Sequence, residues 1–176
     1  QLSGSNLNTI TTAVPFLLIT PDSRSGAMGD VGVAISPDAN AIHWNPSKLV
    51  FIDETYDMGF SISYSPWLRA LVNDINLAYL SGYKRVDRLS TIGASLRYFS
   101  LGNITFTDIQ GTEIRDFKPN EFALDVVYSR LLSDNFSAGL SARYIYSNLT
   151  GGISSGQGGP TKNFANSIST DLSLYY

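Results

Sequence analysis

The chain has 176 residues, of which 43% are hydrophobic, 12% aromatic and only 15% charged, with a formal net charge of −3. A typical soluble domain is about 25% charged, and nothing in this acidic balance indicates a nucleic-acid partner. The absence of cysteine excludes disulfides, cysteine-ligated metal sites and thiol catalysis. We expect Gln1 to begin a processed chain that once carried an export signal.

The amino-terminal part divides into two stretches. Residues 1–12 are polar and aperiodic, which predicts a flexible tail. Residues 13–50 are rich in small side chains, and Asp38 is expected to cap a short helix across Asn40 to Trp44. Small residues allow close packing, so we expect residues 13–50 to form a hatch, or plug, inside a barrel. The residues expected to shape this hatch are Gly26, Gly29, Asp30, Asn45 and Pro46.

Residues 51–176 alternate with a period of two, which is typical of strands with two unlike faces. Between Phe136 and Ser147, one face is apolar and the other is rich in Ser and Gly, with almost no Lys. Similar segments begin near Tyr56, Asp74, Thr91, Glu121 and Ser167. These are about six strands of roughly ten residues, the length that crosses a bilayer when tilted.

This pattern predicts an all-β fold, a transmembrane antiparallel up-and-down β-barrel with outer-membrane lipid against the apolar face. In the segment from Asp74, the expected apolar face carries Ile75, Leu77 and Tyr79. A soluble β-sandwich is the alternative. Six strands are too few to close, because the smallest single-chain membrane barrels have about eight. We therefore expect a fragment, an incompletely built chain or one part of a larger sheet, and favour the first two.

Charged residues in the strands are expected to point into the barrel. A cation on the lipid face at mid-bilayer costs roughly 2–4 kcal/mol, so Arg97 and Arg143 should meet acids such as Asp125 or Asp171. The predicted polar network of the lumen is Asp57, Arg97, Asp125, Arg143 and Asp171. Arg130 falls on the lipid side at a strand end, where its side chain can reach the headgroups.

The connections alternate between short and long, as in outer-membrane barrels with short periplasmic turns and long outer loops. We place the turns at Asp87 and Asp134 on the periplasmic side. Aromatic residues should then form two interfacial girdles. The outer girdle is Tyr64, Tyr98, Phe122, Tyr144 and Tyr146, and the periplasmic girdle is Tyr56, Tyr83, Tyr128 and Tyr176.

Two apolar loop clusters are candidate protein-binding surfaces, because exposed apolar patches often mark partners. The first comprises Trp67, Leu68, Leu71 and Val72, and the second comprises Ile104, Phe106 and Ile109. The second lies in a stretch where residues 103–109 and 112–117 can pair as a hairpin. Packing over the barrel mouth is the alternative for both clusters.

Nothing in the sequence predicts catalysis, a cofactor or a metal site. His43 is the only histidine, and no set of ligands has a metal-binding spacing. A histidine that packs within the hatch explains it better than a catalytic triad does.

The segment Arg24-x-Gly26-Ala27-Met28-Gly29-Asp30-x-Gly32-Val33-Ala34, followed by Asp38–Ile42 and Asn45-Pro46, resembles the hatch of FadL-type outer-membrane transporters. More narrowly, the segment from Ala13 to Arg24 followed by this hatch resembles the PorV family (also called LptO) of the type IX secretion system of Bacteroidetes. The specific part of the resemblance covers residues 13–50. Ser47 departs from the FadL-type motif, which more often has Ala there.

The resemblance implies a FadL-like barrel of about fourteen strands when complete, about six of them in this chain. It also implies a protein that is not an enzyme and that binds the carboxy-terminal signal domain of secreted cargo. The implied partners are a SprA/Sov-type translocon, on which it docks, and a PorU-type sortase attachment complex at the cell surface, to which it delivers cargo. Two alternatives stay open: a transporter of hydrophobic small molecules, and a structural barrel that seals a larger channel.

Overall fold

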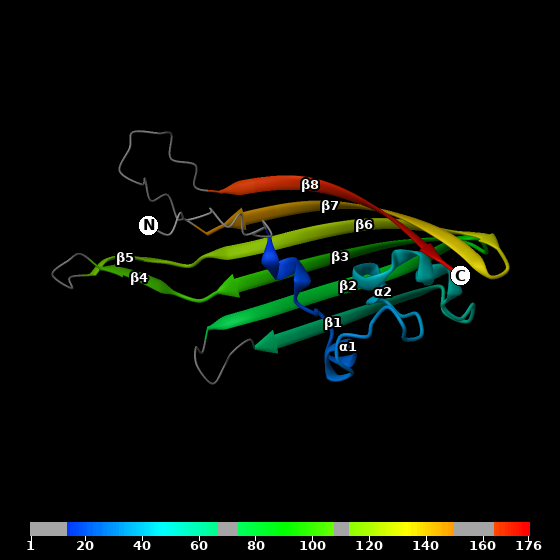
Figure 1. Cartoon of the computed structure of the whole chain (residues 1–176), viewed down its shortest axis with the longest axis horizontal. Coiled ribbons are helices and arrows are strands. Elements are labelled where there is room, and N and C mark those ends of the chain that lie inside the picture. Colours follow the sequence, from blue (N-terminus) through cyan, green and yellow to red (C-terminus); the bar gives the residue numbers. More distant parts are fainter. Residues whose placement is uncertain (1–13, 67–73, 108–112, 150–163) are drawn as a thin grey trace, which may run out of the picture.

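Figure 1 shows a computed structural model of the chain, which describes residues 14–66, 74–107, 113–149 and 164–176. The described part is dominated by one long antiparallel sheet of six strands, in the order β1-β2-β3-β6-β7-β8. The strands are β1 (Met58–Pro66), β2 (Ile75–Asp87), β3 (Ser90–Leu101), β6 (Asn120–Ser133), β7 (Phe136–Asn148) and β8 (Ala165–Tyr175). The expected all-β, antiparallel character is confirmed, and each strand begins within two residues of its predicted start. The sheet is open, with β1 and β8 at its edges.

Four short helices precede the sheet and lie against one of its faces (Figure 1). They are η1 (Pro15–Leu18), α1 (Ser23–Ala27), α2 (Ala41–Trp44) and η2 (Pro46–Phe51). We call the face toward these helices the inward face and the opposite one the outward face. The tail predicted for residues 1–12 lies outside the described residues. The sheet begins at Met58, seven residues after the position where the barrel was expected to start.

The predicted short helix is present as α2, but its cap differs from the expectation. Asn40 occupies the N-cap position and its side chain makes no capping bond. The side chain of Asp38 instead contacts the N-cap residue itself: its Oδ1 accepts a hydrogen bond from the backbone N–H of Asn40 at 2.8 Å. Asp38 therefore shapes the turn that leads into the helix.

Burial along the strands follows the predicted alternation in five of the six strands. In β3, Ile92 and Leu96 are exposed on the outward face, whereas Ser95 and Arg97 are buried on the inward face. The same phase holds in β6, where Leu124 is exposed. The polar face is therefore the one that the amino-terminal helices cover.

The prediction for β2 was wrong in phase. Leu77 and Tyr79 are 1% and 2% exposed on the inward face, and Leu80 points outward. Tyr83 shares the inward face, where its ring lies against Gly59, so it does not belong to an outward girdle. The physical reason is that β2 meets an apolar part of the hatch, where Phe16 packs with Leu77 in one cluster.

Two small apolar cores join the hatch to the sheet. The first contains Phe16, Leu77, Phe99, Ala123 and Ile145. The second contains Ala41, Ile42, Leu49, Ile52 and Val127. Each core includes at least one hatch residue and residues of the strands, so the inward face is occupied over much of its length.

The connections sort as expected among the described residues. Two-residue turns join β2 to β3 and β6 to β7, at one end of the sheet in Figure 1. At the other end, β4 (Ile104–Thr107) and β5 (Glu113–Phe117) pair as the predicted antiparallel hairpin. No helix in the described ranges is long and apolar enough to cross a membrane.

Candidate functional site

The part of the inward face that η2 covers is built of small residues, because η2 approaches it closely. The hydroxyl of Ser129 donates to the carbonyl of Pro46 at 2.6 Å, and that of Ser137 donates to the carbonyl of Ser47 at 2.7 Å. A Cβ added at Gly139 would lie 2.9 Å from the backbone nitrogen of Ser47. Larger side chains at these positions would push η2 away from the sheet.

Asn45 and Pro46, two of the predicted hatch residues, begin η2 and attach it to the sheet. The side-chain oxygen of Asn45 accepts from the backbone N–H of Ser47 at 3.2 Å, which caps the helix. Its Nδ2 donates to the carbonyl of Leu174 in β8 at 3.0 Å. Pro46 suits the first helical position, where no intrahelical N–H partner is needed.

Gly29 and Asp30 form the turn that follows α1. Both have positive φ, 77° and 64°, a region that glycine enters freely and aspartate tolerates at some cost. Asp30 is held there because its N–H donates to the carbonyl of Ser25 at 2.9 Å and its carboxylate accepts from the hydroxyl of Thr20. The backbone therefore reverses direction at this point and leads into the following loop.

Gly26, the remaining predicted hatch glycine, lies in α1 and has room for a side chain. A Cβ there would meet its nearest atom, in Thr20, at an ordinary 3.7 Å. The crowded glycine is Gly32, which belongs to the quoted motif but not to the residues expected to shape the hatch: its Cβ would lie 2.1 Å from the ring of Trp44. Crowding of this kind depends on a contact between distant residues, so the glycine spacing did not show which glycine is crowded.

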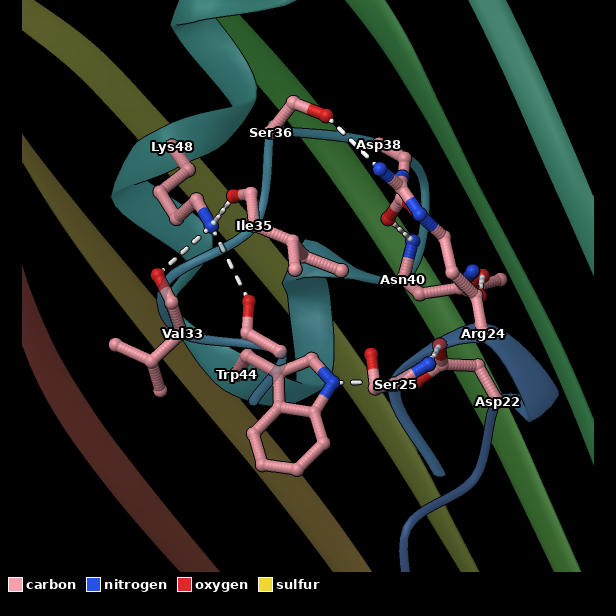
Figure 2. Close-up of polar contacts among 12 residues, drawn as sticks. Asp22, Arg24, Ser25, Val33, Ile35, Ser36, Asp38, Asn40, Trp44 and Lys48 are labelled. Carbon is pink, nitrogen blue, oxygen red and sulfur yellow. Dashed lines mark hydrogen bonds and ion pairs between the residues drawn. The ribbon is translucent and has the colours of Figure 1, made fainter. Parts of the chain in front are cut away.

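Lys48 was also missed as a hatch residue. Its side chain is buried, and its Nζ donates to the backbone carbonyls of Gly32, Val33 and Ile35 at 3.2, 2.9 and 2.5 Å. Figure 2 shows the ammonium group between the carbonyls of Val33 and Ile35. The ammonium therefore ties the loop that follows Asp30 to η2, with three neutral acceptors in place of a carboxylate.

Asp22 links α1 to α2. One carboxylate oxygen accepts from the backbone N–H of Ser25 at 2.8 Å, which caps α1, and the other accepts from the indole Nε1–H of Trp44 at 3.1 Å. Nearby, Arg24 pairs with Asp38 at 3.1 Å (Figure 2). The hatch is thus cross-linked by polar contacts as well as by its two cores.

Arg97 joins the middle of β3 to the hatch. Its guanidinium donates to the carbonyls of Phe16 and Leu17 at 3.1 and 2.8 Å, and lies 2.7 Å from Nδ1 of His43. The ring of Tyr79 lies beneath it, 5.5 Å from the ring centroid to the guanidinium carbon. The expected ion pair of Arg97 with Asp125 or Asp171 is absent among the described residues, because hatch carbonyls take those donors.

His43 is held neutral by this arrangement. Its pKa is lowered to about 3, mainly by burial and then by the positive charges of Arg97 and Arg143, against which Asp22 acts in the raising direction. Because Arg97 can only donate, Nδ1 of His43 must be the acceptor and its proton must sit on Nε2. The ring packs edge-on against Trp44 with centroids 4.7 Å apart, so His43 is part of the hatch packing.

The other predicted network residues divide between two places. Arg143 pairs with Asp125 at 2.5 Å and lies 3.9 Å from Asp171, and Ser95 donates to Asp125 at 2.9 Å. Asp57 lies apart from them, just before β1, where its carbonyl accepts from the backbone N–H of Arg85. Asp57 therefore lies at the end of the sheet and is not part of the group formed by Arg143, Asp125 and Asp171.

Of the two apolar loop clusters, the first and Ile109 lie outside the described residues. Ile104 and Phe106 both belong to β4, and Ile104 is 43% exposed. The base of the hairpin is fixed, since the carboxylate of Asp74 accepts from the backbone N–H of Asn103 at 2.6 Å. The carboxylate also crowds Gly102, whose φ of 85° reverses the chain there.

The outward face carries a continuous set of exposed apolar side chains. Phe60 and Ile62 in β1 are 80% and 74% exposed, and Leu172 in β8 is 75% exposed. This continuity across the sheet is far beyond scattered surface apolar residues and indicates a face that contacts something other than water. No group of three or more potential metal ligands occurs in the described ranges.

The comparison with known families places this chain clearly. Residues 2–176, essentially the whole chain, match the family model described as Type IX secretion system protein PorV. No curated protein matches the chain. The family match extends well beyond residues 13–50, the part that carried the resemblance in the sequence.

Proposed function

The chain belongs to the PorV family of type IX secretion system proteins, and we propose that it acts in the bacterial outer membrane as the cargo-binding component of that system. In this proposal the six strands are part of a FadL-like barrel wall, and residues 13–50 are its hatch. The observation that carries the proposal is the asymmetry of the sheet, with one face exposed and apolar and the other covered by the hatch. A membrane barrel requires this asymmetry, because lipid contacts one face of every strand.

The hatch contacts support binding and delivery over conduction. The hatch is fixed to the inward face by Arg97, Ser129 and Ser137, and by two apolar cores. In this proposal the hatch stays bound to the wall, and folded cargo does not pass through this barrel. Cargo is therefore bound at the outer loops, where the carboxy-terminal signal domain meets the two apolar loop clusters.

The partners follow from this placement. The barrel docks on a SprA/Sov-type translocon, which supplies the path across the membrane, and hands cargo to a PorU-type attachment complex. The role needs recognition surfaces and no reacting groups, in keeping with a family of secretion components that is not known for enzymes.

The test is a pull-down from detergent-solubilised membranes with an affinity-tagged protein. We expect recovery of a very large translocon barrel and of cargo carboxy-terminal domains. Replacing Trp67 and Leu68 by serine, or Ile104 and Phe106 by serine, should reduce recovery of one partner or both. Asp134→Asn, at a short turn at the opposite end of the sheet, is the matched control. Full recovery of both partners by both loop variants would overturn the assignment of the loops.

A transporter of hydrophobic small molecules is the second candidate, favoured by one observation. A cavity of about 550 Å³ lies between the hatch and the edge strand β1, lined in part by Leu18, Ile19, Pro21 and Tyr64. Asp22 and Asp30 also line it, so its wall is mixed. Recovery of a fatty acid, with neither translocon nor cargo, would favour this function. Loss of translocon binding with cargo recognition intact would instead favour a structural barrel that seals a larger channel.

A further inference from the structure

The outward face contains a depression in the middle of its apolar surface. Its volume is about 490 Å³, and it lies over Gly82 and Ala94, between Phe60 on one side and Val126 on the other. These four residues form one row across the sheet, because the register pairs Phe60 with Gly82, Gly82 with Ala94, and Ala94 with Val126. The depression therefore lies where two neighbouring positions of one row, Gly82 and Ala94, have no side chain beyond Cβ.

The neighbouring rows close the depression at both ends. Toward the long loops, the row contains Leu80 and Leu96, paired across β2 and β3. Toward the short turns, it contains Lys84 and Ile92, which also line the cavity. The result is an apolar recess with a single cationic group at the end nearer the short turns.

The fold does not require glycine at position 82. The φ of Gly82 is not positive, and an added Cβ would come no closer than 3.4 Å to another atom, the carbonyl oxygen of Gly59. The inward Gly139 differs, because its Cβ would meet Ser173 and Ser47 at under 3.0 Å. Glycine within a strand weakens it and often marks close approach by a ligand.

The charges on the outward face lie at the end with the short turns. Within the six strands, the cations in the outward phase are Lys84 and Arg130. Asp87 joins them there, because a bulge after Arg85 pairs it with Ser90, whose hydroxyl contacts that of Tyr128. The row of Lys84 and Ile92 continues into Tyr128. Lys84 makes no ion pair with any described residue. An anionic group beside the depression would thus meet an ammonium group that pairs with no described carboxylate.

We propose that the depression binds a phospholipid, with the phosphate on the ammonium group of Lys84 and the first part of an acyl chain over Gly82 and Ala94. The proposal rests on the outer-membrane location given above. Lys84 lies about 7 Å along β2 from Gly82, the right order for a headgroup beside the start of its own chain. Arg130 shares its cross-strand row with Asp87, so Lys84 is the cation on which the preference for an anionic headgroup rests.

The experiment uses the full protein purified in mild detergent, with phosphatidylglycerol as the probe and native mass spectrometry as the readout. We expect one phosphatidylglycerol molecule to stay bound. Lys84→Gln should weaken its retention about fivefold, the effect of one cation near an anionic lipid surface. Gly82→Leu should fill the depression and abolish the retention. Ala142→Leu is the matched control, because it places the same leucine side chain in the same row beyond Val126.

Circular dichroism of each variant shows whether it folds, and insertion into vesicles tests the location separately. Retention of phosphatidylglycerol by a folded Gly82→Leu variant would overturn the lipid site. So would preferential retention of lipid A, or equal loss in the Ala142→Leu control. A chain that inserts into vesicles without retaining the probe overturns the lipid site alone, whereas a chain that stays stable in buffer without detergent overturns the location as well.

Discussion

The guanidinium of Arg97, in the centre of β3, lies 2.7 Å from Nδ1 of His43 in the hatch. The hydrogen bond from Arg97 to His43 requires a neutral imidazole. A protonated imidazole has no acceptor nitrogen and would repel the guanidinium. The contact therefore links the attachment of the hatch to the protonation state of one side chain.

Acid is expected to weaken the folded state through His43. Its folded pKa of about 3 lies below the ordinary value of 6.5, so the unfolded chain binds the proton first as the pH falls. The stability contributed by neutral His43 is fully present above about pH 6.5 and is lost progressively as the pH falls towards 3. Denaturant unfolding in detergent across this range measures the slope. His43→Gln should flatten it, and an unchanged slope in that variant would contradict the assignment.

Removing the ammonium group of Lys48 should free the loop that it holds. Lys48→Met leaves the carbonyls of Gly32, Val33 and Ile35 without their donor, at an expected cost of about 2–3 kcal/mol in the free energy of unfolding. Amide hydrogen exchange should rise first in residues 32–36. Lys84→Met, at an exposed lysine, is the control, and equal destabilisation by both variants would exclude a special role for Lys48.

Gly32→Ala should displace the indole of Trp44. A Cβ at residue 32 would lie 2.1 Å from that ring, so the ring must move and its hydrogen bond to Asp22 must break. Overpacking of this kind costs typically about 1–3 kcal/mol. The indole N–H resonance of Trp44 reports the displacement. Gly26→Ala is the matched control, since helical Gly26 has room and alanine there should be neutral or slightly stabilising. A resonance left in place by Gly32→Ala would refute the crowding.

The contact between η2 and β7 predicts a difference between two glycines on opposite faces. Gly139→Ala places a methyl group 2.9 Å from the backbone nitrogen of Ser47, which cannot give way without lifting η2. Limited proteolysis near residues 46–52 should accelerate in this variant. In Gly82→Ala, the added Cβ would lie 3.4 Å from its nearest atom, so this variant should leave the cleavage rate unchanged. Equal rates in both variants would mean that η2 does not need the close approach.

The proposed membrane location predicts that the cost of a charge depends on its position along the strand. Leu96→Arg puts a cation in the middle of the outward face. It should destabilise the protein folded in vesicles by roughly 2–4 kcal/mol. Leu132→Arg, near the short turn after β6, should cost about 0–1 kcal/mol, because the charge there reaches the interface. Equal costs for the two variants would argue against a bilayer around this sheet.

The alternation of residues was enough to predict most of the sheet. In β3 and β7, the inward positions are mostly small or polar and the outward ones mostly apolar, so the period of two predicted which way each side chain points. The short turns and the hairpin of β4 and β5 were predicted for the same reason, because local patterns and turn residues specify them.

Tertiary structure alone decided which surface each apolar set meets. The pattern predicted that Ile75, Leu77 and Tyr79 face outward, yet they lie on the inward face. Ile75 and Leu77 pack in the cluster that contains Phe16, and the ring of Tyr79 lies against Arg97. The hydrophobicity of a side chain indicates that it is buried away from water. It does not show whether lipid or the hatch covers that side chain. The partners of Arg97 and Lys48 were hidden for a related reason. Backbone carbonyls accept their hydrogen bonds, and a carbonyl is present at every residue, so no sequence pattern marks the one that folding brings near.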